Sequence, residues 1–183
     1  GFSDVVLAGL ARDGGLYVPH EWPAFGAAEI RAMRGLPYAD LAIRVLSPYL
    51  GGEVSPKVFE RLAREAYATF RHDAVCPLVQ IGPDTFLLEL FHGPTLAFKD
   101  VAMQLLARLI DHVLAERGQR ATIVGATSGD TGGAAIEAFA GRERTDIFIL
   151  FPHGRVSPVQ QMQMTTSAAA KLWVGIWFQI STR

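Results

Sequence analysis

The chain has 183 residues, of which 50% are hydrophobic and 19% are charged. This composition excludes a disordered chain, and the length is enough for one ordinary domain or two small ones. Seventeen basic residues against 18 acidic ones give a net charge of −1, which disfavours a general nucleic-acid binder. No apolar run approaches the ~20 residues of a membrane span, and the start has no secretory pattern. Because Cys76 is the single cysteine, we expect no disulfide framework and a reducing, cytoplasmic compartment.

Residues 1–76 are predicted to form a mainly helical N-terminal domain. Apolar residues recur there at three and four positions, and serine and proline mark helix starts. The expected elements are a helix over 4–11 with Ser3 as N-cap, an extended piece at 16–18, an irregular or weakly helical stretch at 23–37, a helix over 38–50, and a helix from Pro56 to about Phe70 with Ser55 as N-cap.

Residues 77–167 are predicted to form part of a second, α/β domain. The expected elements are a buried strand at 85–90, a helix at 101–117, a strand at 121–126, a helix at 134–140, a strand at 146–151 and a helix from Ser157 to about Thr165. Because crossover connections require parallel strands, this β-α-β-α-β order predicts one parallel sheet with flanking helices. The loops after its first two strands would then share one edge of the sheet, where open α/β sheets bind ligands. The tail, 168–183, has no clear pattern.

The first of these loops ends at Lys99, one of only three lysines in the chain. Leu96, Ala97 and Phe98 directly precede it, and apolar surroundings lower the pKa of a lysine amine. A free amine is the form that attacks an aldehyde carbon. Asp100 either faces the amine and opposes this effect or caps the following helix. A plain surface lysine at a helix start is the alternative, although a cation is unfavourable at the positive end of a helix.

The second loop reads Gly125-Ala126-Thr127-Ser128-Gly129-Asp130-Thr131-Gly132-Gly133. Backbone N–H groups between a strand and a helix N-terminus, with glycines beside them, are typical of a cradle for phosphate or carboxylate. A simple turn capped by Ser128 or Asp130 is the alternative. Thr127 also occupies the centre of a Gly-x-nucleophile-x-Gly pattern, but a hydrolase needs a later acid and histidine, and only His153 follows. No P-loop or dinucleotide fingerprint occurs, and the histidines lack metal-ligand spacing.

Together the two loops resemble those of the threonine synthase family, pyridoxal-phosphate enzymes with the tryptophan-synthase-β-like fold. The resemblance extends to Leu-Ala-Arg-Asp-Gly-Gly-Leu-Tyr-Val-Pro at 10–19 and Phe-Pro-His-Gly-Arg-Val-Ser at 151–157, and it covers residues 1–167. It implies a lyase of threonine biosynthesis that converts O-phosphohomoserine and water to L-threonine and phosphate.

The resemblance also implies roles for particular residues. Lys99 would bond to the aldehyde of pyridoxal phosphate and move protons at the α and β carbons of the substrate. Asp130 would lie close to the cofactor ring, and His92 would border the site. The positions implied to bind substrate are Thr127, Ser128, Gly129 and Thr131.

Two features depart from the family pattern. The family's chain continues beyond Ser167 and supplies a glycine-rich cradle for the cofactor phosphate and a partner for the pyridine nitrogen, which are not recognisable here. The last four residues, 180–183, resemble a strand that in the family precedes Gly1. We therefore expect an incomplete fragment that acts with the missing remainder of the chain or as a homo-oligomer. A catalytically silent domain that binds a phosphorylated metabolite or a partner chain is the alternative hypothesis.

Overall fold

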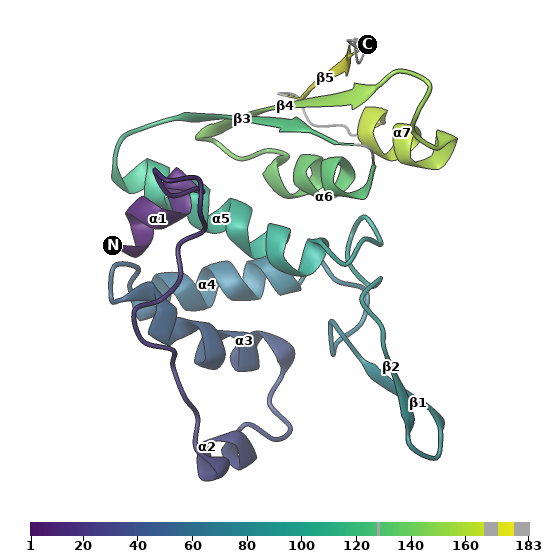
Figure 1. The fold of residues 1–183 in the computed structure, drawn as a ribbon. Helices are drawn as coiled ribbons and strands as arrows, with labels where there is room; N and C mark the ends of the chain where they lie inside the picture. Colours follow the sequence, from purple (N-terminus) through teal and green to yellow (C-terminus); the bar gives the residue numbers. More distant parts are fainter. Residues whose placement is uncertain (128, 167–171, 178–183) are drawn as a thin grey trace. The chain divides into compact units, whose positions relative to one another are not determined.

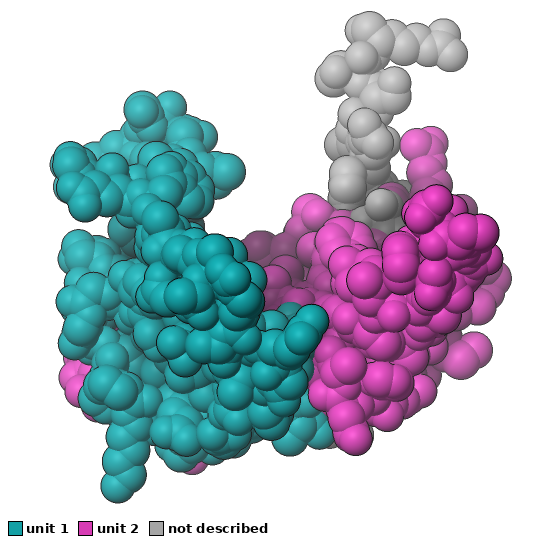
Figure 2. All heavy atoms as spheres, turned by 90° about the horizontal axis from the view of Figure 1, so that it is seen from below, with its two compact units in different colours: residues 1–68 teal, residues 69–183 magenta. Residues whose placement is uncertain are grey.

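The computed structural model describes residues 1–127, 129–166 and 172–177, the last range as backbone only. Contacts divide the chain into two compact units, residues 1–68 and residues 69–183, which Figure 2 shows in different colours. The domain boundary expected between residues 76 and 77 lies slightly further along the chain and stays a prediction.

The first unit is helical, in agreement with the apolar spacing of its sequence (Figure 1). Ser55 is confirmed as an N-cap, because its hydroxyl oxygen accepts the N–H of Val58 at 3.4 Å. The helices are α1 (Phe2–Ala8), α2 (Ala27–Ala32), α3 (Tyr38–Leu46), the short 3-10 helix η1 (Ser47–Leu50) and α4 (Pro56–Tyr67).

The predicted N-cap at Ser3 is wrong. Helix α1 begins at Phe2, so Ser3 lies inside its first turn. The N–H groups of Phe2 and Ser3 donate to the two carboxylate oxygens of Glu53, at 2.7 and 3.0 Å. At the start of α1, the hydrogen-bond acceptor for the helix N–H groups is therefore Glu53, about 50 residues away in sequence. At the start of α4, the acceptor is the adjacent Ser55. The bond from the Ser3 N–H is the main reason that the pKa of Glu53 lies below its ordinary value.

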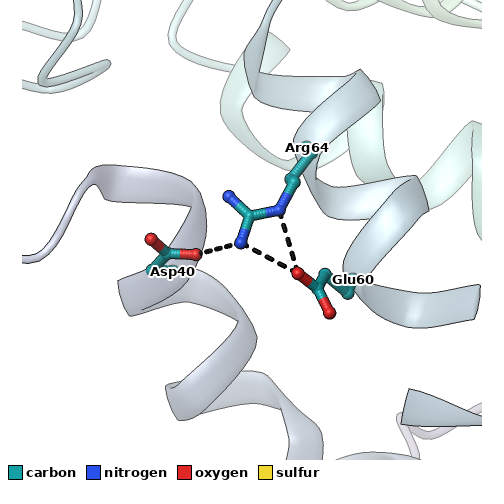
Figure 3. Close-up of polar contacts among 3 residues, drawn as sticks. All are labelled: Asp40, Glu60 and Arg64. Carbon is teal, nitrogen blue, oxygen red and sulfur yellow. Dashed lines mark hydrogen bonds and ion pairs between the residues drawn. The ribbon is translucent and has the colours of Figure 1, made fainter. Parts of the chain in front are cut away.

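Arg64 links the two longer helices of this unit (Figure 3). Its Nη2 lies 2.5 Å from Oδ1 of Asp40 on α3 and 2.9 Å from Oε1 of Glu60 on α4. All three side chains are substantially exposed to solvent. The rings of Tyr38 and Tyr67 add an edge-to-face contact, with centroids 4.8 Å apart. Both the Arg64 ion pair with Asp40 and this ring pair therefore connect α3 to α4.

The sheet of the second unit has three parallel strands among the described residues. Strand β4 (Thr145–Pro152) lies between β3 (Ala121–Ala126) and β5 (Leu172–Trp177). Burial alternates along β4, where Ile147, Ile149 and Phe151 face the core. Strand β5 falls in the tail for which the sequence predicts no element, and it pairs with β4 from Ile147↔Leu172 to Pro152↔Trp177.

The first strand expected in this sheet lies elsewhere. Residues Leu78–Gly82 (β1) and Thr85–Leu88 (β2) form an antiparallel hairpin of their own (Figure 1). Every residue of β2 is exposed. The prediction of a buried parallel strand at 85–90 is wrong because two short apolar runs pair with each other across the turn at residues 83–84. Only the second of the two loops therefore follows a strand of the parallel sheet.

Three helices pack in the second unit: α5 (Asp100–Glu116), α6 (Asp130–Phe139) and α7 (Pro158–Thr165). Helix α6 is central, since it contacts α5, α7 and β4. It begins at Asp130, earlier than the apolar spacing predicts, because two glycines adopt helical conformation in its first turn. Ser157 caps α7 as expected and accepts the N–H of Gln160 at 3.2 Å. In the described part of the chain, no helix is long and apolar enough to span a membrane.

The two adjacent glycines of α6 have very different surroundings. A methyl group at Gly132 would lie 2.5 Å from Cγ2 of Thr127 and 2.7 Å from Sδ of Met164. At Gly133 the nearest atom would be Cβ of Gln163, at an ordinary contact distance of 3.8 Å. Gly132 therefore sets how closely α6 approaches the strand end and α7, whereas Gly133 does not.

We expect Gly132→Ala to lower the free energy of unfolding by about 1–3 kcal/mol, because the added methyl group overpacks this contact. Gly133→Ala is the matched control. The methyl group has room there, and alanine is favoured over glycine in a helix by roughly 1 kcal/mol, so stability should stay unchanged or rise. Denaturant unfolding followed by circular dichroism measures both variants. Equal losses at the two positions would contradict the packing described.

We expect Asp40→Asn to lower the denaturant midpoint at low ionic strength, because it removes the carboxylate that joins α3 to Arg64. The effect should shrink in about 1 M NaCl, since exposed ion pairs are screened by salt. A double-mutant cycle with Arg64→Gln isolates the coupling. Glu65→Gln, whose partner Arg61 lies on the same helix, is the control for charge removal within α4. A coupling of equal size at both salt concentrations would speak against an ion pair.

Candidate functional site

The loop at residues 91–99 joins β2 to α5 through tight turns. The N–H of Leu96 donates to the carbonyl of Gly93 at 3.2 Å, and the N–H of Asp100 donates to that of Ala97 at 3.0 Å. Leu96 has φ of 65°, in the left-handed region, which costs a residue with a Cβ atom about 1–2 kcal/mol. Such a conformation persists only where its surroundings hold it.

The side chain of Asp100 stabilises this conformation of the loop. The residue is completely buried, and its two carboxylate oxygens accept the N–H and the hydroxyl of Thr95, both at 2.8 Å. A side chain at Gly93 would collide with this carboxylate, so the glycine is needed for the close approach. Burial raises the pKa of Asp100 above its ordinary value, and the bonds from Thr95 oppose that shift. Of the two orientations considered for Asp100, the helix cap is wrong, because the side chain turns back to the loop, and both of its oxygens are engaged by Thr95 rather than by the amine of Lys99.

Lys99 is the last residue before the first turn of α5. Its Nζ lies 4.2 Å from the centroid of the Phe98 ring, a cation–π contact. The side chain is partly exposed and borders a cavity of about 420 Å³. The other side chains that line this cavity are apolar: Leu90, Phe98, Val101, Ala102 and Met103. An amine beside such a cavity can attack the carbonyl carbon of a flat, largely apolar ligand.

The second loop connects β3 to α6. The hydroxyl oxygen of Thr127 accepts the N–H of Gly129 at 3.3 Å, so this hydroxyl is engaged within the turn. The N–H groups of Asp130 and Thr131 have no partner among the described residues, and both lie in the first turn of α6. This end of a helix carries partial positive charge and can hold an anion. Ser128, the remaining position expected to bind substrate, lies outside the described residues.

Helix α7 contacts both loops. Nε2 of Gln160 donates to Oδ1 of Asp130 at 2.8 Å, and a side chain at Gly129 would meet Cδ of Gln160 at 2.5 Å. One turn further along, Nε2 of Gln163 donates to the carbonyl of Thr95 at 3.3 Å. The two glutamines therefore connect two segments to the same helix: the glycine turn (residues 125–133) and the lysine loop (residues 91–99). Sequence reasoning missed both, because glutamine on a mostly exposed helix carries no signal of such a contact.

A second cavity, of about 340 Å³, lies where the lysine loop meets the helices. Thr95 and Leu96 line it from the loop, Gly133 and Glu137 from α6, and Gln163 from α7. The residues expected at the site thus fall into two groups that share α7 as support. Lys99 belongs to the first group, and Thr127, Gly129, Asp130 and Thr131 form the second. The cavity beside Lys99 is not lined by any described residue of the second group.

His92 begins the lysine loop and has a defined partner. Its Nε2 lies 2.7 Å from Oε2 of Glu89, and both side chains are mostly buried. The centroid of the imidazole ring lies 4.8 Å from that of the Phe91 ring and 5.0 Å from that of the His72 ring, and both pairs are tilted. The sequence marks His92 as a residue near the site, but nothing in the sequence identifies Glu89 as its partner.

Comparison with known proteins relates this arrangement to one family. Residues 1–67 match the family description "Threonine synthase N terminus". The chain is 58% identical over 165 residues to threonine synthase of Pseudomonas aeruginosa, an alignment that covers 90% of this chain and 35% of that protein. It is 44% identical over 174 residues to threonine synthase of Schizosaccharomyces pombe, with 90% and 34% covered. The chain therefore spans about a third of the length of these curated relatives.

Solved structures agree in fold as well as in sequence. The crystal structure of PLP-bound threonine synthase from Brucella melitensis superimposes with a TM-score of 0.92 at 70% identity, over 95% of this chain and 38% of that one. Threonine synthase from yeast gives a TM-score of 0.90 at 39% identity, with 95% and 37% covered. These matches confirm an α/β fold with a helical N-terminal region. The chain is therefore similar, in sequence and in structure, to about a third of these threonine synthases, and its residues 1–67 match the family's N-terminal description.

Proposed function

We propose that this chain is part of a threonine synthase, an enzyme that converts O-phosphohomoserine and water to L-threonine and phosphate. In this reaction phosphate leaves from the γ carbon and the oxygen of water bonds to the β carbon. The observation that carries the proposal is the position of Lys99, whose amine lies over the Phe98 ring beside an apolar cavity. The relatives that are named threonine synthases, and the PLP-bound structure among them, support it.

The residues present fit pyridoxal phosphate at its aldehyde and its ring. Lys99 offers a primary amine to an aldehyde, and the apolar cavity next to it suits an aromatic ring. The first turn of α6 offers the N–H groups of Asp130 and Thr131, which have no partner among the described residues, to an anionic group of the substrate. We propose that the groups that hold the cofactor phosphate and the ring nitrogen come from the part of a threonine synthase chain beyond the matched third.

When bound, pyridoxal phosphate supplies an electron sink for negative charge at the substrate's α carbon. Nζ of Lys99 would take the proton from that carbon and return a proton to the substrate, because its amine would be freed when the substrate amine replaces it. Thr127, Ser128, Gly129 and Thr131 would hold the anionic groups of the substrate. Asp130, kept in place by Gln160, would lie close to the cofactor ring.

The proposed setting of the reaction follows from the rest of the chain. A reducing compartment suits a chain in which Cys76 is the single cysteine, and we propose that the enzyme acts in the cytoplasm. Its partners would be the small-molecule substrate and the remaining part of a threonine synthase chain. The near-neutral net charge disfavours nucleic acid as a partner.

We expect Lys99→Arg to abolish the attachment of pyridoxal phosphate, because arginine keeps the positive charge but has no primary amine. The protein of natural length is incubated with pyridoxal phosphate and reduced with borohydride, and the labelled peptide is identified by mass spectrometry. Lys57→Arg, on helix α4 of the first unit, is the control and should label like the unmodified protein. Label that persists in Lys99→Arg, or that lies mainly on Lys57, would refute the assignment of Lys99.

A further inference from the structure

The fully buried carboxylate of Asp100 has no part in the function proposed above. A buried charge is costly unless hydrogen bonds compensate it. At Asp100 both compensating bonds come from one residue, Thr95, through its N–H and its hydroxyl. Among the described residues, no hydrogen bond or ion pair joins the carboxylate of Asp100 to the amine of Lys99. The carboxylate therefore acts on the loop and not directly on the lysine.

Thr95 is held from two sides. Asp100 binds its N–H and hydroxyl, and Gln163 of α7 donates to its carbonyl oxygen at 3.3 Å. The hydroxyl oxygen of Thr95 also accepts the N–H of Ala97 at 3.4 Å. Between Thr95 and Ala97, Leu96 keeps its left-handed conformation. All three polar groups of Thr95 thus serve to fix the course of the loop.

The segment that contains Phe98 and Lys99 is enclosed between these anchors. The carbonyl of Phe98 accepts the N–H of Val101 at 3.2 Å, and the carbonyl of Lys99 accepts the N–H of Met103 at 2.9 Å. On the other side, the bond between Asp100 and Thr95 closes the loop into a ring. Both ends of the segment are therefore fixed, and the amine of Lys99 lies 4.2 Å from the centroid of the Phe98 ring.

We propose that Asp100 is a positioning residue that, through Thr95, holds the amine of Lys99 over the Phe98 ring at the edge of the apolar cavity. This inference rests on the proposed function of Lys99. It assigns Asp100 no contact with substrate or cofactor. A carboxylate that merely stabilised the fold would leave the position of the amine unchanged when its bonds to Thr95 are weakened, and this difference can be measured.

The measurement uses the protein of natural length, freed of bound aldehydes and reductively methylated with ¹³C-formaldehyde. Methyl groups on an amine above an aromatic ring resonate upfield, so dimethylated Lys99 should be displaced upfield of the exposed Lys57. Lys99→Arg assigns the signal. Residues 1–183 contain three lysines, and Lys57→Arg assigns the reference signal of Lys57. No cofactor is involved, so the result is independent of the borohydride experiment on Lys99.

Thr95→Val removes the hydroxyl bond to Asp100 and keeps the N–H, and Asp100→Leu removes both acceptors. In each, we expect the Lys99 signal to move downfield to the position of Lys57. Thr95→Ser keeps the hydroxyl that Thr95→Val lacks, so its Lys99 signal should stay upfield. The matched control is Asp111→Leu, on the same helix, where the carboxylate accepts the N–H of Arg144 at 2.8 Å far from the lysine. Its Lys99 signal should stay upfield.

An unchanged Lys99 signal in folded Thr95→Val would overturn the proposal. So would an equal downfield movement in Asp111→Leu, because loss of stability alone would then explain the effect. Should Asp100→Leu fail to fold, the comparison of Thr95→Val with Thr95→Ser still decides. If the borohydride label is absent from Lys99 but the Thr95 variants move its signal as expected, the positioning holds and the proposed function fails.

Discussion

The lysine loop depends on one compensated buried charge. Asp100 is removed from water, and such a charge is tolerated only because two donors of Thr95 face it. The same two bonds hold Leu96 in a conformation that a free chain would leave. Lys99 follows this constrained segment directly, at the start of α5.

Glycine has a second role at this site besides exposing backbone N–H groups to an anion. Gly93 admits the carboxylate of Asp100, Gly129 admits the side chain of Gln160, and Gly132 admits Thr127 and Met164. A methyl group at Gly93 or Gly132 would overlap packed atoms, whereas one at Gly129 would displace the amide end of Gln160. The glycine-rich turn is therefore a packed junction between β3, α6 and α7 as well as a potential cradle, and only the cradle is visible in the sequence.

Much of the fold follows from local signals in the sequence. Apolar spacing places α3, α4 and α5, and the serine–proline pairs at residues 55 and 157 mark the starts of α4 and α7. The sequence could not place β2, because a short apolar run looks the same in a buried strand and in an exposed hairpin. The sequence did not predict strand β5, because its apolar and polar residues do not alternate clearly and the strand is defined by its pairing with β4. At the site, lysine and the polar turn are identified by their chemistry. Gln160, Gln163 and the Thr95–Asp100 pair depend on how distant segments meet, which no local pattern records.

Gln160 and Gln163 lie one turn apart on the short helix α7. Gln160 donates a hydrogen bond to Asp130 after the glycine turn, and Gln163 donates one to Thr95 in the lysine loop. A helix moves as a rigid body, so any displacement of α7 is shared by the two loops. The geometry of the glycine-rich turn and that of the loop before Lys99 are therefore linked through one element rather than set independently.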